Sequence, residues 1–202
     1  MEKETSRTEA FSDGVFAIAI TLLVLDLRVP QLEESASSVE LAHALLKRWP
    51  SYLAFVTSFA TILIMWINHH GIFESVQKID TRFMFANGLL LLLVAAVPFP
   101  TALVAEYLAR PGASMACAVY SGTFVIINIA FNLLWWSAIR KRTLLKSDVS
   151  EEKVRSITKN YLLGFPLYMI ATISAFFSAY LSMGICTALW IFWVIKKPQP
   201  TE

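Results

Sequence analysis

Long apolar runs separated by short polar segments dominate this chain of 202 residues. A helix needs ~20 apolar residues to cross a hydrocarbon core ~30 Å thick, so six crossings would take about 120 residues. The pattern therefore predicts an all-α polytopic membrane protein, with six transmembrane helices in a single unit that covers residues 1–202. The six expected spans are 11–29, 52–68, 83–105, 113–139, 160–180 and 183–195.

Prolines and the length of the last apolar run set several of these boundaries. We expect Pro30 to end the first helix, and Pro98 and Pro100 to kink or break the third. No charged residue or histidine occurs in 160–195. One straight helix of that length would measure ~54 Å, well beyond a core of ~30 Å. The run therefore predicts a hairpin, with its turn near residues 182–184.

The polar segment between the first two spans predicts a different kind of helix. Three leucines recur at helical spacing within residues 37–48, and polar side chains surround them. This pattern is typical of a short amphipathic helix that lies on a membrane surface, here on the outer side. The leucines are Leu41, Leu45 and Leu46.

Composition and charge narrow the class of protein. Only 16% of residues are charged and the mean hydropathy is +0.59, which argues against a water-soluble globule. A net charge of +2 argues against nucleic acid as a partner. With six spans, 13 of the 17 Lys and Arg residues fall on the side of the two termini, Lys196 and Lys197 among them. The positive-inside rule then predicts a multi-pass protein of the cell (inner) membrane with cytoplasmic N- and C-termini.

Signatures of enzymes and of metal sites are missing from the sequence. There is no phosphate loop, no Gly-rich dinucleotide fingerprint and no potassium filter of the Thr-Val-Gly-Tyr-Gly type. His69 and His70 could ligate a metal with Glu74, but adjacent residues point ~100° apart on a helix. We therefore expect no enzyme activity, no metal and no cofactor, and interpret the histidines as a polar cap that pairs with Ser12 or Asp13.

The first apolar run carries a stripe with two interpretations. Ile18, Leu22 and Leu25 follow i, i+4, i+7 spacing and share one helix face. Periodicity alone favours a stripe that packs in the chain's own core. The alternative is an apolar ring around a symmetry axis, which gates by dewetting. Polar chemistry at both ends of so short a run favours the alternative. The same face extends to Phe11, Gly14 and Val29.

Three short motifs resemble one known family over nearly the whole chain. Arg7-x-x-x-Phe11-Ser12-Asp13, followed by the apolar run, resembles the first helix of the prokaryotic branch of the endosomal/lysosomal potassium channels (transmembrane protein 175 type). The stretches Trp66-Ile-Asn68-His69-His70 and Pro98-Phe-Pro100-Thr101 resemble the same family.

The resemblance implies a potassium-preferring cation channel without a carbonyl-lined selectivity filter. It implies a homotetramer whose first helices line a central pore in the lipid bilayer. Ile18 would form the narrowest hydrophobic ring, Leu22 and Leu25 would form further rings, and Thr21 would be a polar pore position. Arg7, Phe11, Ser12 and Asp13 would tie the pore helix to the second span, with Trp66, Asn68 and His69 as partners.

Two other functions stay open at this point. A small secondary transporter would need a broken helix and a polar site at mid-membrane. Pro98 and Pro100 supply a break, but no ionisable residue lies beside them. A membrane enzyme would have to use His69, His70 and Asp13. The favoured prediction is passive conduction of potassium ions, with other monovalent cations passing more weakly.

Overall fold

The computed structural model describes residues 2–195, and all regular elements within that range are helices. This confirms the prediction of an all-α protein. Lys196 and Lys197, which the charge count used, lie outside the described residues. The α-helices are α1 (Glu2–Leu22), α2 (Ser38–Lys47), α3 (Trp49–Ser75), α4 (Thr81–Ala96), α5 (Pro98–Tyr107), α6 (Ala113–Ile139), α7 (Glu151–Ser174) and α8 (Ala179–Ile195). Two 3-10 turns, Leu23–Asp26 and Arg142–Leu144, follow α1 and α6.

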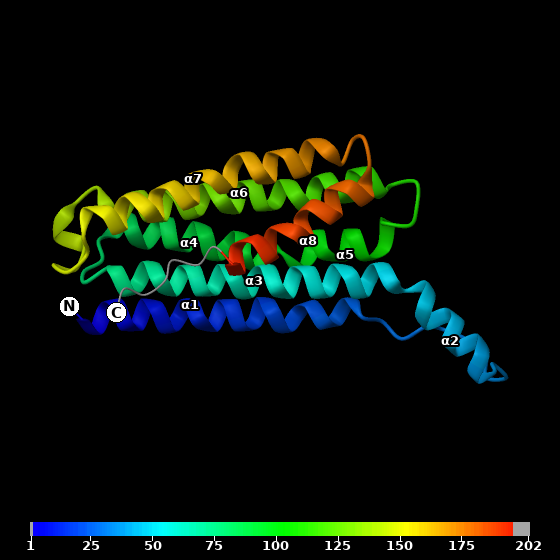
Figure 1. The fold of residues 1–202 in the computed structure, drawn as a ribbon. Helices are drawn as coiled ribbons and strands as arrows, with labels where there is room; N and C mark the ends of the chain where they lie inside the picture. The colour runs from blue at the N-terminus through cyan, green and yellow to red at the C-terminus, as the bar shows by residue number, and fades with distance from the viewer. Residues whose placement is uncertain (1, 196–202) are drawn as a thin grey trace.

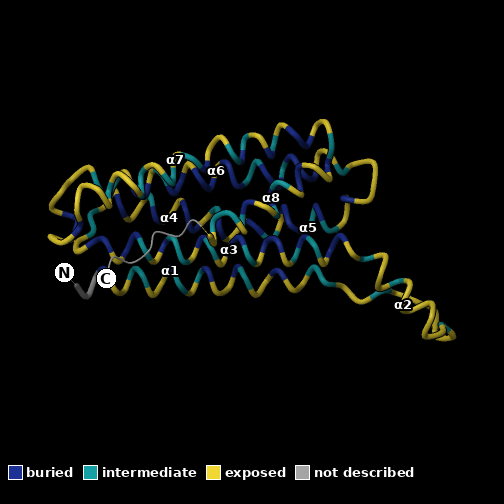
Figure 2. Tube along the Cα trace, in the orientation of Figure 1, coloured by how far each residue is buried: buried dark blue, intermediate teal, exposed yellow. Residues whose placement is uncertain are grey.

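The helices form an elongated bundle with α1 along one edge (Figure 1). α1 packs against α3 and α4, while α6 packs against α4, α5, α7 and α8. The amphipathic helix α2 projects from one end of the bundle and buries none of its residues in the chain. Figure 2 shows that the buried residues lie mainly in α3, α4 and α6, whereas α1 is exposed along its outer side.

Four helical segments of the described residues are long and apolar enough to cross a membrane. They are Thr5–Asp26, Trp49–Ser75, Thr81–Tyr107 and Ala113–Ile139, of which the third joins α4 and α5. α8 is a shorter apolar helix. The first half of α7 is charged and its second half apolar.

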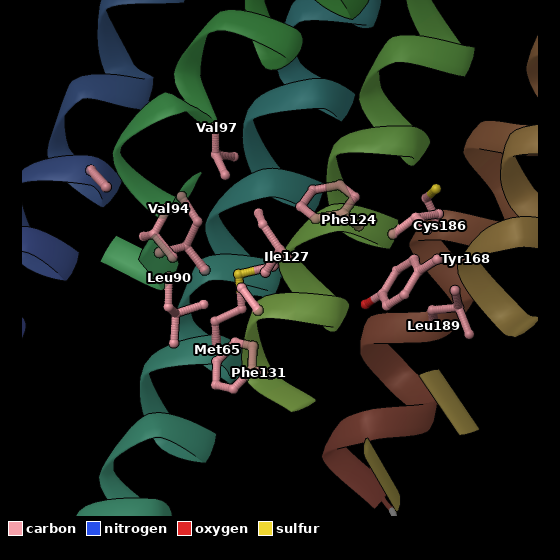
Figure 3. Close-up of a cluster of buried hydrophobic side chains, with 14 of the residues drawn as sticks. Met65, Leu90, Val94, Val97, Phe124, Ile127, Phe131, Tyr168, Cys186 and Leu189 are labelled. Carbon is pink, nitrogen blue, oxygen red and sulfur yellow. The ribbon is translucent and has the colours of Figure 1, made fainter. Parts of the chain in front are cut away.

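The core lies where α3, α4, α6, α7 and α8 meet, and it consists of aliphatic and aromatic side chains (Figure 3). Leu90 and Val94 of α4 face Ile127 of α6, and Tyr168 of α7 lies near Leu189 of α8. Because this core forms without the outer face of α1, that face is free to contact other molecules.

The break at Pro98 is confirmed. Proline has no backbone N–H and its ring crowds the carbonyl four residues earlier, so α4 ends at Ala96 and α5 begins at Pro98. Buried hydroxyls lock the broken segment to its neighbours. Ser58 Oγ lies 2.8 Å from Thr101 Oγ1 and 3.0 Å from Tyr120 Oη, which joins α3, α5 and α6.

The expected bounds of the first helix, 11–29, were wrong. α1 begins at Glu2, because residues 2–10 contain no Gly or Pro and favour helix. Its α-helical part ends at Leu22, and a 3-10 turn continues to Asp26. Pro30 disfavours helical backbone at the residue before it, so the chain leaves the helix before Val29.

The expected hairpin turn at 182–184 was also wrong. The reversal between α7 and α8 lies at residues 175–178, and residues 182–184 are helical. The Ser178 hydroxyl accepts a hydrogen bond from the Leu181 backbone N–H at 3.3 Å, which caps α8. α7 begins at Glu151, well before residue 160, because Ser150 caps it and two glutamates fill its first turn.

Candidate functional site

α1 has one buried face that anchors it to the bundle. Phe16 and Ala19 are almost fully buried where α1 packs against α3 and α4, and Leu23 is buried in the following 3-10 turn, which contacts α3 and α5. The Phe16 ring lies 5.2 Å from the His69 ring of α3. Ser12 lies on the same face and is also buried. This spacing follows a helical period, so the opposite face of α1 must point away from the chain.

That opposite face carries the apolar stripe. Ile18 is 60% exposed, Leu22 41% and Leu25 67%. Phe11 and Gly14 extend the exposed face toward the N-terminus. The interpretation of the stripe as packing in the chain's own core is therefore wrong, since the core-packed residues of α1 lie on the other face.

Thr21 lies on the exposed face beside Leu22. Its hydroxyl donates back to its own helix, 3.0 Å from the Ala17 carbonyl and 2.9 Å from the Ile18 carbonyl. Its Oγ1 can still accept a hydrogen bond on this face. Among the exposed residues of 10–25, Thr21 is the only polar one, and none is charged. Such a surface offers ions little to replace their hydration shell.

A cavity of about 880 Å³ lies between α3, α6, α7 and α8. It is lined by Asn68 and His70 of α3, by Asn128 of α6 and by Tyr161 of α7, among others. α1 contributes no residue to it. The exposed stripe and this cavity are therefore separate features of the chain.

The predicted network at the N-terminal half of α1 forms in part. The Trp66 indole Nε1 donates to Asp13 Oδ1 at 2.8 Å, which ties α1 to α3. Ser12 and His69 are both fully buried and are joined through a third residue, Asn87 of α4. Asn87 Nδ2 donates to Ser12 Oγ at 3.0 Å, and Asn87 Oδ1 lies 2.8 Å from His69 Nε2.

Sequence reasoning missed Asn87. Its signal was present, because a lone amide in an otherwise apolar span has to find a hydrogen-bond partner. The identity of that partner could not be derived, because Asn87 lies far along the chain from both Ser12 and His69.

Three expected members do not enter the network within one chain. The Asn68 side chain donates to the Ile64 carbonyl of its own helix at 2.9 Å. Phe11 is exposed, and Arg7 is exposed and makes no ion pair with the residues that the structure describes. His70 pairs with Glu9 of α1 at 2.8 Å, which adds a second contact between the two helices.

Comparison with known proteins identifies the family. The family model described as endosomal/lysosomal potassium channel TMEM175 matches residues 7–98. A potassium channel of Chamaesiphon minutus is 52% identical over 97% of this chain and 96% of its own length. A potassium channel of Streptomyces collinus is 44% identical over 98% of this chain and 96% of its own length.

The fold agrees with a solved structure. The crystal structure of a lysosomal potassium-selective channel TMEM175 homolog from Chamaesiphon minutus superposes with a TM-score of 0.87 at 50% identity. The match covers 97% of this chain and 100% of that one. The chain therefore belongs to the endosomal/lysosomal potassium channel TMEM175 family of membrane channels.

Proposed function

We propose that the chain conducts potassium passively, with other monovalent cations passing more weakly, through a hydrophobic constriction that α1 forms. The observation that carries this proposal is the division of α1 into a packed face and an exposed apolar face. A helix with so short an uncharged run is poorly suited to face lipid on that side. If copies of α1 surround a symmetry axis, the apolar stripe faces that axis and lines the pore instead of facing lipid.

Selectivity in such a pore comes from dehydration. A ring of Ile18 side chains has no oxygen atoms to replace water around an ion. Potassium holds its water less tightly than sodium, so the narrow apolar ring costs potassium less. No carbonyl-lined filter is needed, and the selectivity that results is modest. Leu22 and Leu25 would form further rings, and Thr21 would add a polar group between them.

The assembly that we propose is a homotetramer with six crossings per chain. The four long apolar segments supply four crossings, and the second half of α7 with α8 would supply a hairpin of two shorter ones. The N-terminal end of α1 lies at the same end of the bundle as the loop between α6 and α7, which is rich in Lys and Arg (Figure 1). By the positive-inside rule, that end would lie on the cytoplasmic side of the inner membrane, and we propose that both termini lie on that side too.

The network of Ser12, Asp13, Trp66, Asn87 and His69 would hold the pore helix at a fixed angle to α3 and α4. Arg7 and Phe11 would contact a neighbouring subunit, since both are exposed in the single chain. This assignment makes the motif structural: it positions the constriction and does not itself select ions.

Flux into liposomes that contain only the purified protein tests the proposal. Potassium uptake should run down its gradient without saturating, exceed sodium uptake, and come with the mass of a tetramer. Empty liposomes serve as the control. Saturable uptake coupled to a second ion would instead indicate a secondary transporter. Full flux through a monomer would refute a pore formed between subunits.

A further inference from the structure

A second cavity lies where the N-terminal end of α4 meets the C-terminal end of α6. Its volume is about 170 Å³. The side chains that line it are Asp80, Arg82, Ala86, Leu133, Trp136, Ser137, Arg140 and Lys141. By the orientation above, this is the cytoplasmic edge of the membrane.

The cavity carries an excess of positive charge. Three bases line it against one acid, Asp80. That carboxylate is already engaged, because it accepts from the Phe83 backbone N–H at 3.0 Å and pairs with Lys141 Nζ at 3.1 Å. Among the residues that the structure describes, Arg82 and Arg140 have no carboxylate within ion-pair distance. Two guanidinium groups are therefore available to an anion.

The wall of the cavity toward the membrane interior is apolar. Ala86 and Leu133 line it there. One helical turn deeper, Leu89 of α4 and Ile129 of α6 are exposed on the same side of their helices. The arrangement combines cationic groups at the water side with an uncovered apolar surface below them, which suits an amphipathic anion.

Trp136 joins the two regions. Its indole is exposed, and the Arg140 guanidinium lies 5.4 Å above the ring. Tryptophan near a helix end is typical of the level of lipid headgroups. Arg140 also lines the cavity and is itself exposed to solvent, so its charge is accessible to a ligand at this position.

We propose that this cavity binds the phosphate of an anionic phospholipid of the cytoplasmic leaflet. Arg82 and Arg140 hold the phosphate, Lys141 shares its charge between Asp80 and the headgroup, and the acyl chains lie along α4 and α6. The site does not depend on conduction through α1, and it would remain if the proposed pore were wrong. Free inorganic phosphate would present the same oxyanion to these side chains. The apolar wall below them favours the phosphate of a lipid instead.

Native mass spectrometry of the detergent-purified assembly measures this binding directly. The probes are phosphatidylglycerol, phosphatidylcholine and inorganic phosphate. The wild type should bind phosphatidylglycerol more tightly than phosphatidylcholine, and excess inorganic phosphate should not displace it. Arg82→Gln and Arg140→Gln should each weaken phosphatidylglycerol binding about fivefold, as expected for one basic side chain near an anionic headgroup.

Two further variants make the result independent of folding defects. Asp80→Asn keeps a capping side chain but removes the competing charge, so it should bind phosphatidylglycerol more tightly than the wild type. Arg155→Gln removes an exposed charge of α7 outside the cavity and should bind as the wild type does. Equal losses in Arg155→Gln and Arg140→Gln, equal binding of the two lipids, or displacement by inorganic phosphate would each overturn the proposal.

Discussion

Replacement of Asn87 with alanine tests the junction of α1, α3 and α4. Asn87 is 2% exposed, and its amide bridges Ser12 of α1 and His69 of α3. Ser12 keeps a partner after the change, because its hydroxyl donates to the Thr8 carbonyl at 2.8 Å. His69 does not, since its Nδ1 already has no hydrogen-bond partner among the described residues.

The cost follows from the state in which His69 is left. Its side chain is fully buried, and both ring nitrogens would lack partners in the variant. An unsatisfied buried polar group costs ~1–3 kcal/mol. The space left by the amide adds roughly 1 kcal/mol. We therefore expect a loss of about 3 kcal/mol in the free energy of unfolding, which lowers Tm by on the order of 10 °C in a chain of this size.

Thermal unfolding followed by size-exclusion chromatography in detergent measures this change, and Asn68→Ala is the matched control. Among the described residues, the Asn68 side chain bonds only to a carbonyl of its own helix, so its loss should cost ~1 kcal/mol or less. The double variant His69→Leu/Asn87→Leu should recover much of the loss, because both polar partners leave together. A larger drop in Tm for Asn68→Ala than for Asn87→Ala would refute the assignment.

Three further predictions concern other contacts. Asp13→Ala removes the acceptor of the Trp66 indole and should cost ~1.5–3 kcal/mol, seen as lower Tm and tetramer yield at an unchanged potassium-to-sodium ratio. Gly164→Ala places a methyl group in a steric clash with the buried Asn128 side-chain amide of α6 and should lower Tm by the equivalent of ~1–3 kcal/mol, whereas Gly88→Ala meets open space and should leave Tm unchanged or higher. Asp80 caps α4, and the hydrogen bond from a backbone N–H holds its pKa below the ordinary 3.8, so its contribution is present above pH 3.8 and is lost as the pH falls through the lowered pKa. The capping contribution is about 1 kcal/mol at pH 7, so the difference in Tm between the wild type and Asp80→Ala should shrink in acid; a constant difference would contradict the capping role.

The sequence predicted the features that local physics controls. Long apolar runs predict helices, Pro98 breaks one, and the period of Ile18, Leu22 and Leu25 places them on one face. Which way that face points was not predictable from periodicity, because a stripe looks the same in a core and in a pore. The direction became clear only from the burial of Phe16 and Ala19 where α1 packs on α3 and α4.

Other features depend on contacts between distant parts of the chain. The partnership of Asn87 with Ser12 and His69 joins three helices, and no short motif contains it. The turn at 175–178 was hidden because Phe176 and Phe177 continue the apolar run, while the small residues near 184 look like a turn. The helical start of α7 was predictable, since Ser150 followed by two glutamates is a capping signal.

Reversal potentials under bi-ionic potassium and sodium conditions test whether Ile18 forms the constriction. Ile18→Asn should wet the ring and lower the dehydration cost of both ions, and sodium gains more because its cost was larger. Current should rise and the potassium-to-sodium permeability ratio should fall, with a smaller effect for Leu25→Asn in a wider ring. Leu92→Asn, an equally exposed apolar position on α4, should leave the ratio unchanged. An unchanged ratio and current in Ile18→Asn would contradict the account and show that the stripe of α1 lines no pore.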